Sequence, residues 1–315
     1  MQAVAASGRL KVSRTTLAAI ALTGLSASES AIAAMSQMRP ITAADSLLIV
    51  APHPDDETLC CAGVIDLARR AGARVSIVWV TDGDGSRTGA MIVGRSILPG
   101  HVRYRELGRR REREARSAAD ILGVAPERQF FLGYPDHGIL PLIRKHYDSP
   151  WRSPRTGAMA VMLDEAVTPG GAYEGRQIER DLASIVEQID PTIVFAPSPR
   201  DLHPDHRAAG LLSMRVMSER SSLDRVRYWI VHGGHDWPLP RESRPDLPQT
   251  ISPRGRGMTW QFVALDAQAC ATKQRALDAH RIPMQAMARI LDSHVRATEL
   301  FALTPGLPRE DFIGY

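Results

Sequence analysis

Short apolar runs alternate along the chain with amphipathic stretches of helical length. Strands are predicted at 47–51, 74–80, 129–132, 192–196 and 227–231. Helices are predicted at 57–71, 103–122, 178–189, 204–220 and 267–300, the last with a break at Pro283. The runs 47–51 and 192–196 are apolar throughout, as in strands that are buried on both faces. Strand and helix in turn predict an α/β fold with a parallel sheet and right-handed crossovers.

Two long stretches interrupt this alternation. Residues 82–102 are rich in glycine and polar residues, and residues 137–175 contain several prolines and the pair Gly170-Gly171. Both are expected to leave the carboxyl ends of strands, where they would form the walls or a lid of a pocket. The first predicted strand is not followed by a GxGxxG motif, so the main signal of a dinucleotide site is missing.

A His-Pro-Asp motif follows each of the two fully apolar strands. The first strand leads into the segment 52–57, Pro-His-Pro-Asp-Asp-Glu, and the later strand leads into His203-Pro204-Asp205-His206. Proline suits the first position of a helix and aspartate suits a helix N-terminus, so each motif is predicted where a strand gives way to a helix. If the two strands are neighbours, the motifs meet at one point.

Imidazoles and carboxylates gathered at one point are typical ligands of catalytic Zn²⁺, which takes three protein ligands and keeps a position for water. Zinc lowers the pKa of that water to about 7. A further carboxylate can take the proton, and a further imidazole can stabilise the oxyanion or protonate the leaving amine. A single His-Pro-Asp would more often be a helix cap, whereas two copies favour the metal.

At these motifs the chain resembles the N-acetylglucosaminyl-phosphatidylinositol de-N-acetylase family, also known as PIG-L or LmbE-like, over about residues 46–301. The resemblance implies a Rossmann-like three-layer sandwich with a mostly parallel sheet and no dinucleotide site. It also implies a zinc-dependent deacetylase with one Zn²⁺ per chain and a zinc-bound water as nucleophile. The implied substrate is an N-acetylglucosamine-type amino sugar in a glycan, glycolipid or glycoconjugate.

The resemblance also suggests roles for the motif residues. His53, Asp56 and His206 look like the zinc ligands. Asp55 looks like the general base that deprotonates the zinc-bound water. His203 looks like the group that stabilises the tetrahedral intermediate. Fe²⁺ and Co²⁺ suit similar ligands, so the sequence alone leaves the identity of the metal open.

Substrate contacts are predicted on weaker grounds. Arg111 and Asp136 align with positions that contact the sugar in the family, and His232 follows a predicted strand and is expected to line the pocket. The residues after His280 depart from the pattern of the family, which leaves the role of the last helix open. The tryptophans are candidates either for stacking on a sugar ring or for burial; they are Trp151, Trp237 and Trp260.

The N-terminus has the features of an export signal. Basic residues precede the apolar run 17–25, and Ala31-Ile32-Ala33 suits a signal peptidase. The run is too short to span a bilayer, so the mature chain is expected to have no transmembrane span and to be periplasmic or secreted, or cytoplasmic if the leader is not functional. The expected parts are a signal peptide (1–33), a linker (34–45), the deacetylase domain (46–303) and a C-terminal tail (304–315).

Charge and cysteine content limit the other classes. The net charge is only +4, with both signs mixed along the chain, so nucleic acid is not an expected partner; the expected partner is an amino-sugar-containing small molecule or glycan. The three cysteines show no metal-binding spacing, and Cys60 and Cys61 are expected to pack as small apolar residues. The oligomeric state does not follow from the sequence.

Other functions remain as alternatives. They are a metal-dependent hydrolase of another amide or of a phosphoester, and a sugar-binding relative without catalysis. Two-metal phosphoesterases need bridging carboxylates and more ligands than the two motifs supply.

Overall fold

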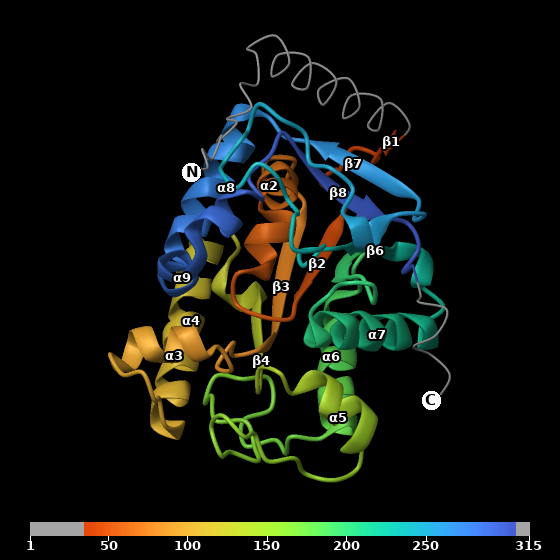
Figure 1. Ribbon diagram of the computed structural model, residues 1–315. Helices are drawn as coiled ribbons and strands as arrows, with labels where there is room; N and C mark the ends of the chain where they lie inside the picture. The colour runs from red at the N-terminus through yellow and green to blue at the C-terminus, as the bar shows by residue number, and fades with distance from the viewer. Residues whose placement is uncertain (1–34, 307–315) are drawn as a thin grey trace, which may run out of the picture.

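The computed structural model describes residues 35–306, which form an eight-stranded sheet with helices on both faces (Figure 1). The strand order is β1-β7-β8-β6-β5-β2-β3-β4. The strands are β1 (Ser36–Gln37), β2 (Ser46–Ala51), β3 (Arg74–Thr81), β4 (Gln129–Tyr134), β5 (Ile193–Pro197), β6 (Val226–Trp229), β7 (Trp260–Ala264) and β8 (Thr298–Ala302).

The sheet is mostly parallel, as predicted. Only β8 runs antiparallel to its neighbours β6 and β7 among the pairings of the described strands. The strands that precede the two motifs, β2 and β5, are direct neighbours, with Leu47 opposite Ile193 and Ile49 opposite Phe195. The condition for the two motifs to meet is therefore fulfilled.

Side-chain alternation in β2 shows why the protein has three layers. Leu47 and Ile49 pack into a core with helices α2, α4, α8 and α9, whereas Leu48 and Val50 pack into a second core with α5, α6 and α7. The eight α-helices of the described part are α2 (Asp56–Arg70), α3 (Arg87–Gly94), α4 (His101–Ile121), α5 (Ile139–Lys145), α6 (Gly175–Ile189), α7 (Pro204–Glu219), α8 (Ala267–Ala279) and α9 (Arg281–Asp292). Short 3₁₀ turns lie at 126–128, 223–225 and 253–255.

The predicted helical stretch over 267–300 is confirmed up to Asp292 and is wrong beyond it. The break lies at His280, between α8 and α9, because Pro283 falls in the first turn of α9, where a backbone N–H has no helical partner to lose. After Asp292 the chain turns, and Thr298–Ala302 becomes strand β8, whose five residues pair with β7. Sheet pairing outweighs the helical pattern here.

Other segments also differ from the prediction, and among them is strand β7, which was not predicted. Ser36–Gln37, in the expected linker, forms β1 and pairs with β7, and the buried Met38 donates its N–H to Phe262 O at 2.9 Å. Helices α3 and α5 lie within the two stretches expected to be loops. Cys60 and Cys61 are buried as expected, but their sulfurs are bonded to each other.

The expected signal peptide (1–33) and most of the expected C-terminal tail lie outside the described residues, so the export signal stays a prediction. Between residues 35 and 306, no helix combines the length and apolar character needed to cross a membrane.

Candidate active site

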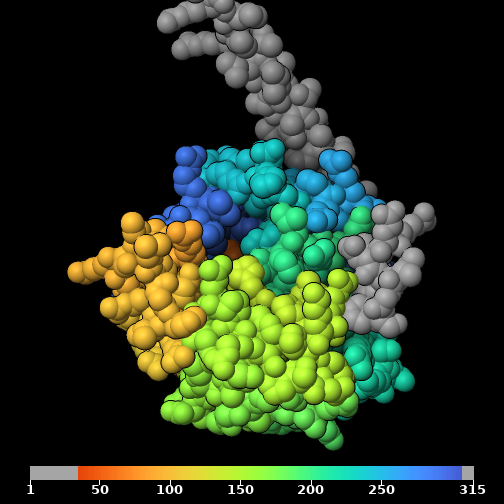
Figure 2. Space-filling view, turned by 60° about the horizontal axis from the view of Figure 1, so that its bottom comes forward, coloured from red at the N-terminus to blue at the C-terminus, as the bar shows by residue number. Residues whose placement is uncertain are grey.

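Both His-Pro-Asp motifs lie at the carboxyl edge of the sheet, where ligands of open α/β sheets bind. β2 ends at Ala51 and α2 begins at Asp56, while β5 ends at Pro197 and α7 begins at Pro204. Seen from this edge, the surface is hollowed between the orange, blue, teal and yellow-green parts of the chain (Figure 2). A pocket of about 240 Å³ there is lined by residues of both motifs.

The three predicted metal ligands converge at the bottom of this pocket. His53 Nδ1 and His206 Nε2 each lie 3.1 Å from Asp56 Oδ2, and the two nitrogens lie 3.3 Å from each other. All three side chains are buried, with His206 fully excluded from solvent. Residues 150 positions apart in sequence thus present three ligand atoms around one point.

The other nitrogen of each imidazole faces a carboxylate. His53 Nε2 lies 3.2 Å from Asp136 Oδ1, and His206 Nδ1 lies 3.4 Å from Asp201 Oδ2. A carboxylate behind a histidine fixes the ring orientation and raises its basicity as a metal ligand. The arrangement therefore fits a bound cation, which would also separate the two facing imidazole nitrogens.

The charges around His206 favour a cation in the same way. Burial lowers the pKa of His206, but the charges of Asp56 and Asp201 outweigh burial and raise it to about 9. The same two carboxylates would attract a metal ion to this position once the imidazole gives up its proton.

Asp201 was missed from the sequence. Its fully buried carboxylate accepts the backbone N–H groups of His203, Val231 and His232 at 2.9, 2.9 and 3.0 Å. It therefore ties the second motif to the end of β6 while it holds His206. The only local signal was its position, in the short segment between β5, which ends at Pro197, and the second motif.

Asp55, the predicted base, lies beside the metal ligands in an unusual backbone conformation. Its φ is 131°, which a residue with a side chain rarely adopts. Arg111 Nη2 donates to Asp55 Oδ2 at 2.9 Å and also to Pro54 O. Burial raises the pKa of Asp55 to about 6 although the charge of Arg111 lowers it. A carboxylate with this pKa suits a general base near neutral pH.

A glycine lets the arginine reach this position. Gly83 follows β3 with φ of 62°, and its carbonyl accepts Arg111 Nη1 at 3.0 Å. A Cβ atom at Gly83 would collide with the guanidinium. Glycine is therefore required both by the left-handed conformation and by the close approach of Arg111.

Behind Asp55 lies a buried network that involves the end of α8. Glu57 Oε2 accepts the N–H of Asp55 at 3.1 Å and Trp79 Nε1–H at 2.8 Å, while Glu57 Oε1 lies 2.8 Å from His280 Nε2. The role of this last part of the chain, which the sequence left open, is thus to support the loop that carries the base.

His203 is the N-cap of α7, and its Nδ1 accepts the backbone N–H of Asp205 at 3.2 Å. Burial, together with the neighbouring imidazoles of His53 and His206, lowers the pKa of His203 to about 2. In the neutral ring with an accepting Nδ1, the proton is on Nε2. His203 therefore offers a neutral hydrogen-bond donor to the pocket.

The three predicted substrate residues all line the pocket, but two have other duties. Arg111 holds Asp55, and Asp136 faces His53 while its Oδ2 accepts the N–H of Gly85 at 3.1 Å. His232 lies beside the metal ligands, with its ring centroid 4.6 Å from that of His206. The sugar contacts of Arg111, Asp136 and His232 therefore stay predictions, although all three side chains are in place at the pocket.

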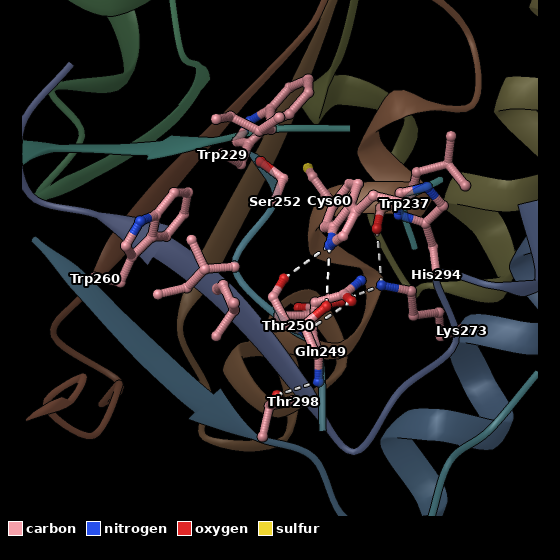
Figure 3. Close-up of a pocket in the computed structure, with 15 residues that line it drawn as sticks. Cys60, Trp229, Trp237, Gln249, Thr250, Ser252, Trp260, Lys273, His294 and Thr298 are labelled. Carbon is pink, nitrogen blue, oxygen red and sulfur yellow. Dashed lines mark hydrogen bonds and ion pairs between the residues drawn. The ribbon is translucent and has the colours of Figure 1, made fainter. Parts of the chain in front are cut away.

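Two of the candidate stacking tryptophans lie elsewhere. Trp237 and Trp260 line a separate cavity together with Lys273 and His294 (Figure 3). Its volume of about 30 Å³ is large enough for a water molecule but too small for a sugar ring. Trp237 Nε1 donates to Thr250 O at 3.0 Å, and Trp260 Nε1 donates to Gly255 O at 2.8 Å. Trp151 packs against the core that contains α5, α6 and α7. All three are structural residues.

Comparison with known proteins agrees with this geometry. The family model described as PIG-L, GlcNAc-PI de-N-acetylase, matches residues 48–217, which include both motifs. The chain belongs to the PIG-L family. Enzymes of this family are metal-dependent deacetylases.

Curated relatives carry deacetylase names. A 1D-myo-inositol 2-acetamido-2-deoxy-alpha-D-glucopyranoside deacetylase of Nocardia farcinica is 26% identical over 86% of this chain and 90% of its own length. A probable N-acetyl-alpha-D-glucosaminyl L-malate deacetylase 2 of Bacillus anthracis is 28% identical, over 59% of this chain and 65% of its own length.

Solved structures show the same fold. The A40926 pseudoaglycone deacetylase Dbv21 is 18% identical, with a TM-score of 0.53 over 82% of this chain and 96% of its own. The N,N'-diacetylchitobiose deacetylase of Pyrococcus horikoshii is 20% identical, with a TM-score of 0.50 over 83% and 84%. The LmbE-like, Rossmann-like fold inferred from the sequence is confirmed by these neighbours and by the sheet topology.

Proposed function

We propose that this PIG-L protein hydrolyses the N-acetyl group of an N-acetylglucosamine-type amino sugar, and that one Zn²⁺ is held by His53, Asp56 and His206. The observation that carries the proposal is the convergence of these three side chains within 3.3 Å of one another beside Asp55. The deacetylase names of its relatives, which act on acetylated glucosamine derivatives by those names, support the substrate class.

The donor set supports zinc. Two imidazoles and one carboxylate are a common ligand set of catalytic zinc, and Zn²⁺ bound there would act as a Lewis acid that makes a water molecule nucleophilic at neutral pH. Asp136 and Asp201, behind the two imidazoles, would keep the nitrogens aimed at the ion.

Two other residues of the site have separate tasks, proton transfer for Asp55 and stabilisation of the oxyanion for His203. Asp55, whose pKa is raised to about 6, accepts a proton from the attacking water, and Arg111 orients its carboxylate. His203 donates its Nε2–H to the oxyanion that develops on the acetyl carbonyl, since a neutral ring can do this without being protonated first. When the C–N bond breaks, the proton that Asp55 accepted passes to the leaving nitrogen, so that acetate and a free amine are the products.

Release of acetate from a panel of N-acetylglucosamine compounds tests the proposal. We expect acetate and free amine to appear in equal amounts, a chelator to stop the reaction and added Zn²⁺ to restore it. Asp55→Asn should keep the zinc content of the wild type while turnover falls by about 10²- to 10⁴-fold, because a general base is lost. The matched control, Asp278→Asn, changes an exposed aspartate of α8 and should leave both unchanged.

Chelator-resistant acetate release would contradict the role of the metal. Unchanged turnover in Asp55→Asn would remove Asp55 as the base. Hydrolysis of phosphate esters with two equivalents of metal per chain would favour the phosphoesterase alternative.

A further inference from the structure

The pocket above the metal ligands has two chemically different sides. One side consists of the histidines and carboxylates of the motifs together with Arg111 and Ser86. The other side is apolar and comes from α9 and from Leu59, one turn along α2 from the first motif. The hydroxyl and amide groups of an acetylated sugar need the polar side. The apolar side must therefore bind a different part of the substrate.

The apolar side is a stripe of residues from both parts of α9, which is kinked at Met287. The residues of α9 that line the pocket are Ile282, Pro283, Ala286, Met287 and Leu291. They lie before, at and after the kink, and all of them face the same pocket. None of the pocket-lining residues from this helix, all of which are described, carries a charge; Arg281, Arg289 and Asp292 lie off this stripe.

The apolar stripe of α9, called the apolar wall from here on, is held in place before any ligand binds. Ile282 packs in a small core with Ala90 and Val93 of α3 and with Tyr104 and Leu107 of α4. The N–H of Ile282 also donates to Glu114 Oε2 of α4 at 3.2 Å. The apolar surface is therefore held in place by its neighbours and is available to a ligand without rearrangement.

The wall extends from the buried bottom of the pocket to solvent. Leu291 is 4% exposed, whereas Met287 is 44% exposed, and the backbone of Met287 departs from helical values. In Figure 2 the blue segment that contains α9 borders the hollow. The acetyl methyl group would need only a small apolar contact near the metal, so this longer surface has room for another part of the substrate.

We infer that the wall binds an apolar aglycone, so that the substrate is an N-acetylated amino sugar linked to an alkyl or aryl group. This inference rests on the proposed deacetylase function. The sugar ring faces the motif side, where its polar groups find hydrogen-bond partners, and the aglycone lies along α9 towards Met287. Removal of apolar surface from water along α9 then contributes to substrate binding.

The test compares two substrates of the zinc-loaded enzyme, the methyl and the octyl glycosides of N-acetylglucosamine, both below the micelle concentration of the octyl compound. We expect kcat/KM for the octyl glycoside to exceed that for the methyl glycoside at least about tenfold, since each buried methylene of the chain adds to binding. Met287→Gln should reduce this ratio at least about threefold.

Ile290→Gln is the matched control. Ile290 lies on the same helix and is 43% exposed, close to the value for Met287, but it does not line the pocket. The ratio should stay at the wild-type value in this variant. Thermal unfolding of both variants checks that they are folded, and Ala286→Glu, which places a charge on the wall, should also lower the ratio.

The outcomes separate the two claims. Equal kcat/KM for the two glycosides, or the same ratio in Met287→Gln as in Ile290→Gln, overturns the inference while acetate release upholds the deacetylase function. Release of acetate from neither glycoside, nor from any other N-acetylglucosamine compound, overturns the proposed function itself.

Discussion

At the scale of single residues, the proposed general base Asp55 has an unusual backbone conformation. Its φ of 131° is disfavoured for a residue with a side chain, by about 1–3 kcal/mol for such outliers, and the bonds to Glu57 and Arg111 hold it there. Asp55 and Asp56 are adjacent in sequence. The unusual conformation lets the first carboxylate serve as the proposed base while the second serves as a proposed metal ligand. Strain at this position is thus part of how the site is built.

The fall of kcat/KM at low pH, the acid limb of its pH profile, tests whether Arg111 sets the ionisation of Asp55. Asp55 must be ionised to act as base, so kcat/KM should fall as the pH drops through its pKa, which burial raises to about 6. A bound cation lowers this pKa, so the limb of the zinc enzyme lies at or below that value. Arg111→Gln removes a charge that also lowers the pKa, and the limb should move to higher pH.

Arg110→Gln is the control for this profile. Arg110 precedes Arg111 on α4, but its guanidinium is on the surface and donates to Glu106 at 2.8 Å. The limb should not move in this variant. A limb that stays in place or moves to lower pH in Arg111→Gln would show that the arginine does not set the ionisation of Asp55.

The sequence was sufficient for the residues that carry a recognisable motif and not for their partners. His53, Asp56 and His206 could be chosen because the motif occurs twice, each time after a buried strand, and because both copies match the pattern of the PIG-L family. Asp201 and the pair of Glu57 with His280 act through buried contacts that depend on how distant segments pack. Apart from the position of Asp201 beside the second motif, no local pattern marks these contacts, so they became visible only in three dimensions.

At the scale of elements, the strands and helices next to the motifs were predicted well, because buried parallel strands are uniformly apolar and their helices have clear starts. Errors occurred where tertiary contacts decide. β8 was taken as the end of a helix, yet its residues pair with β7. Helices α3 and α5 were missed because each has eight or fewer residues, within glycine- or proline-rich segments.

One buried ion pair joins three of these elements. Lys273 of α8 donates to Glu299 of β8 at 2.7 Å, and Glu299 also accepts the N–H groups of Gly63 and Val64 of α2. Both charged side chains are almost fully buried. Lys273→Met leaves Glu299 as an unpaired buried charge, so we expect a loss of about 3–5 kcal/mol in the free energy of unfolding.

An exposed ion pair between α2 and the start of α8 provides the control. Arg70 of α2 donates to Asp266, the N-cap of α8, at 2.7 Å, but both side chains are accessible to solvent. Arg70→Met should cost no more than about 1 kcal/mol. Urea unfolding of the two variants measures the difference, and similar losses for both would mean that burial of the Lys273 pair does not matter.

At the scale of the whole molecule, function follows from the strand order. β2 and β5 are far apart in sequence and adjacent in the sheet, so the turns after them bring both motifs to one place. The helices α4, α8 and α9 then complete the site from one face, by supplying Arg111, His280 and the apolar wall. A large α/β sheet thus serves mainly to hold a few side chains in fixed relative positions.

The most direct test of this account is a crystal structure of the zinc-loaded protein with anomalous diffraction measured at the zinc edge. The account predicts one peak per chain, at about 2.0–2.2 Å from His53 Nδ1, His206 Nε2 and a carboxylate oxygen of Asp56. A peak bound by other residues, or no zinc between these three side chains in an enzyme that still releases acetate, would contradict it.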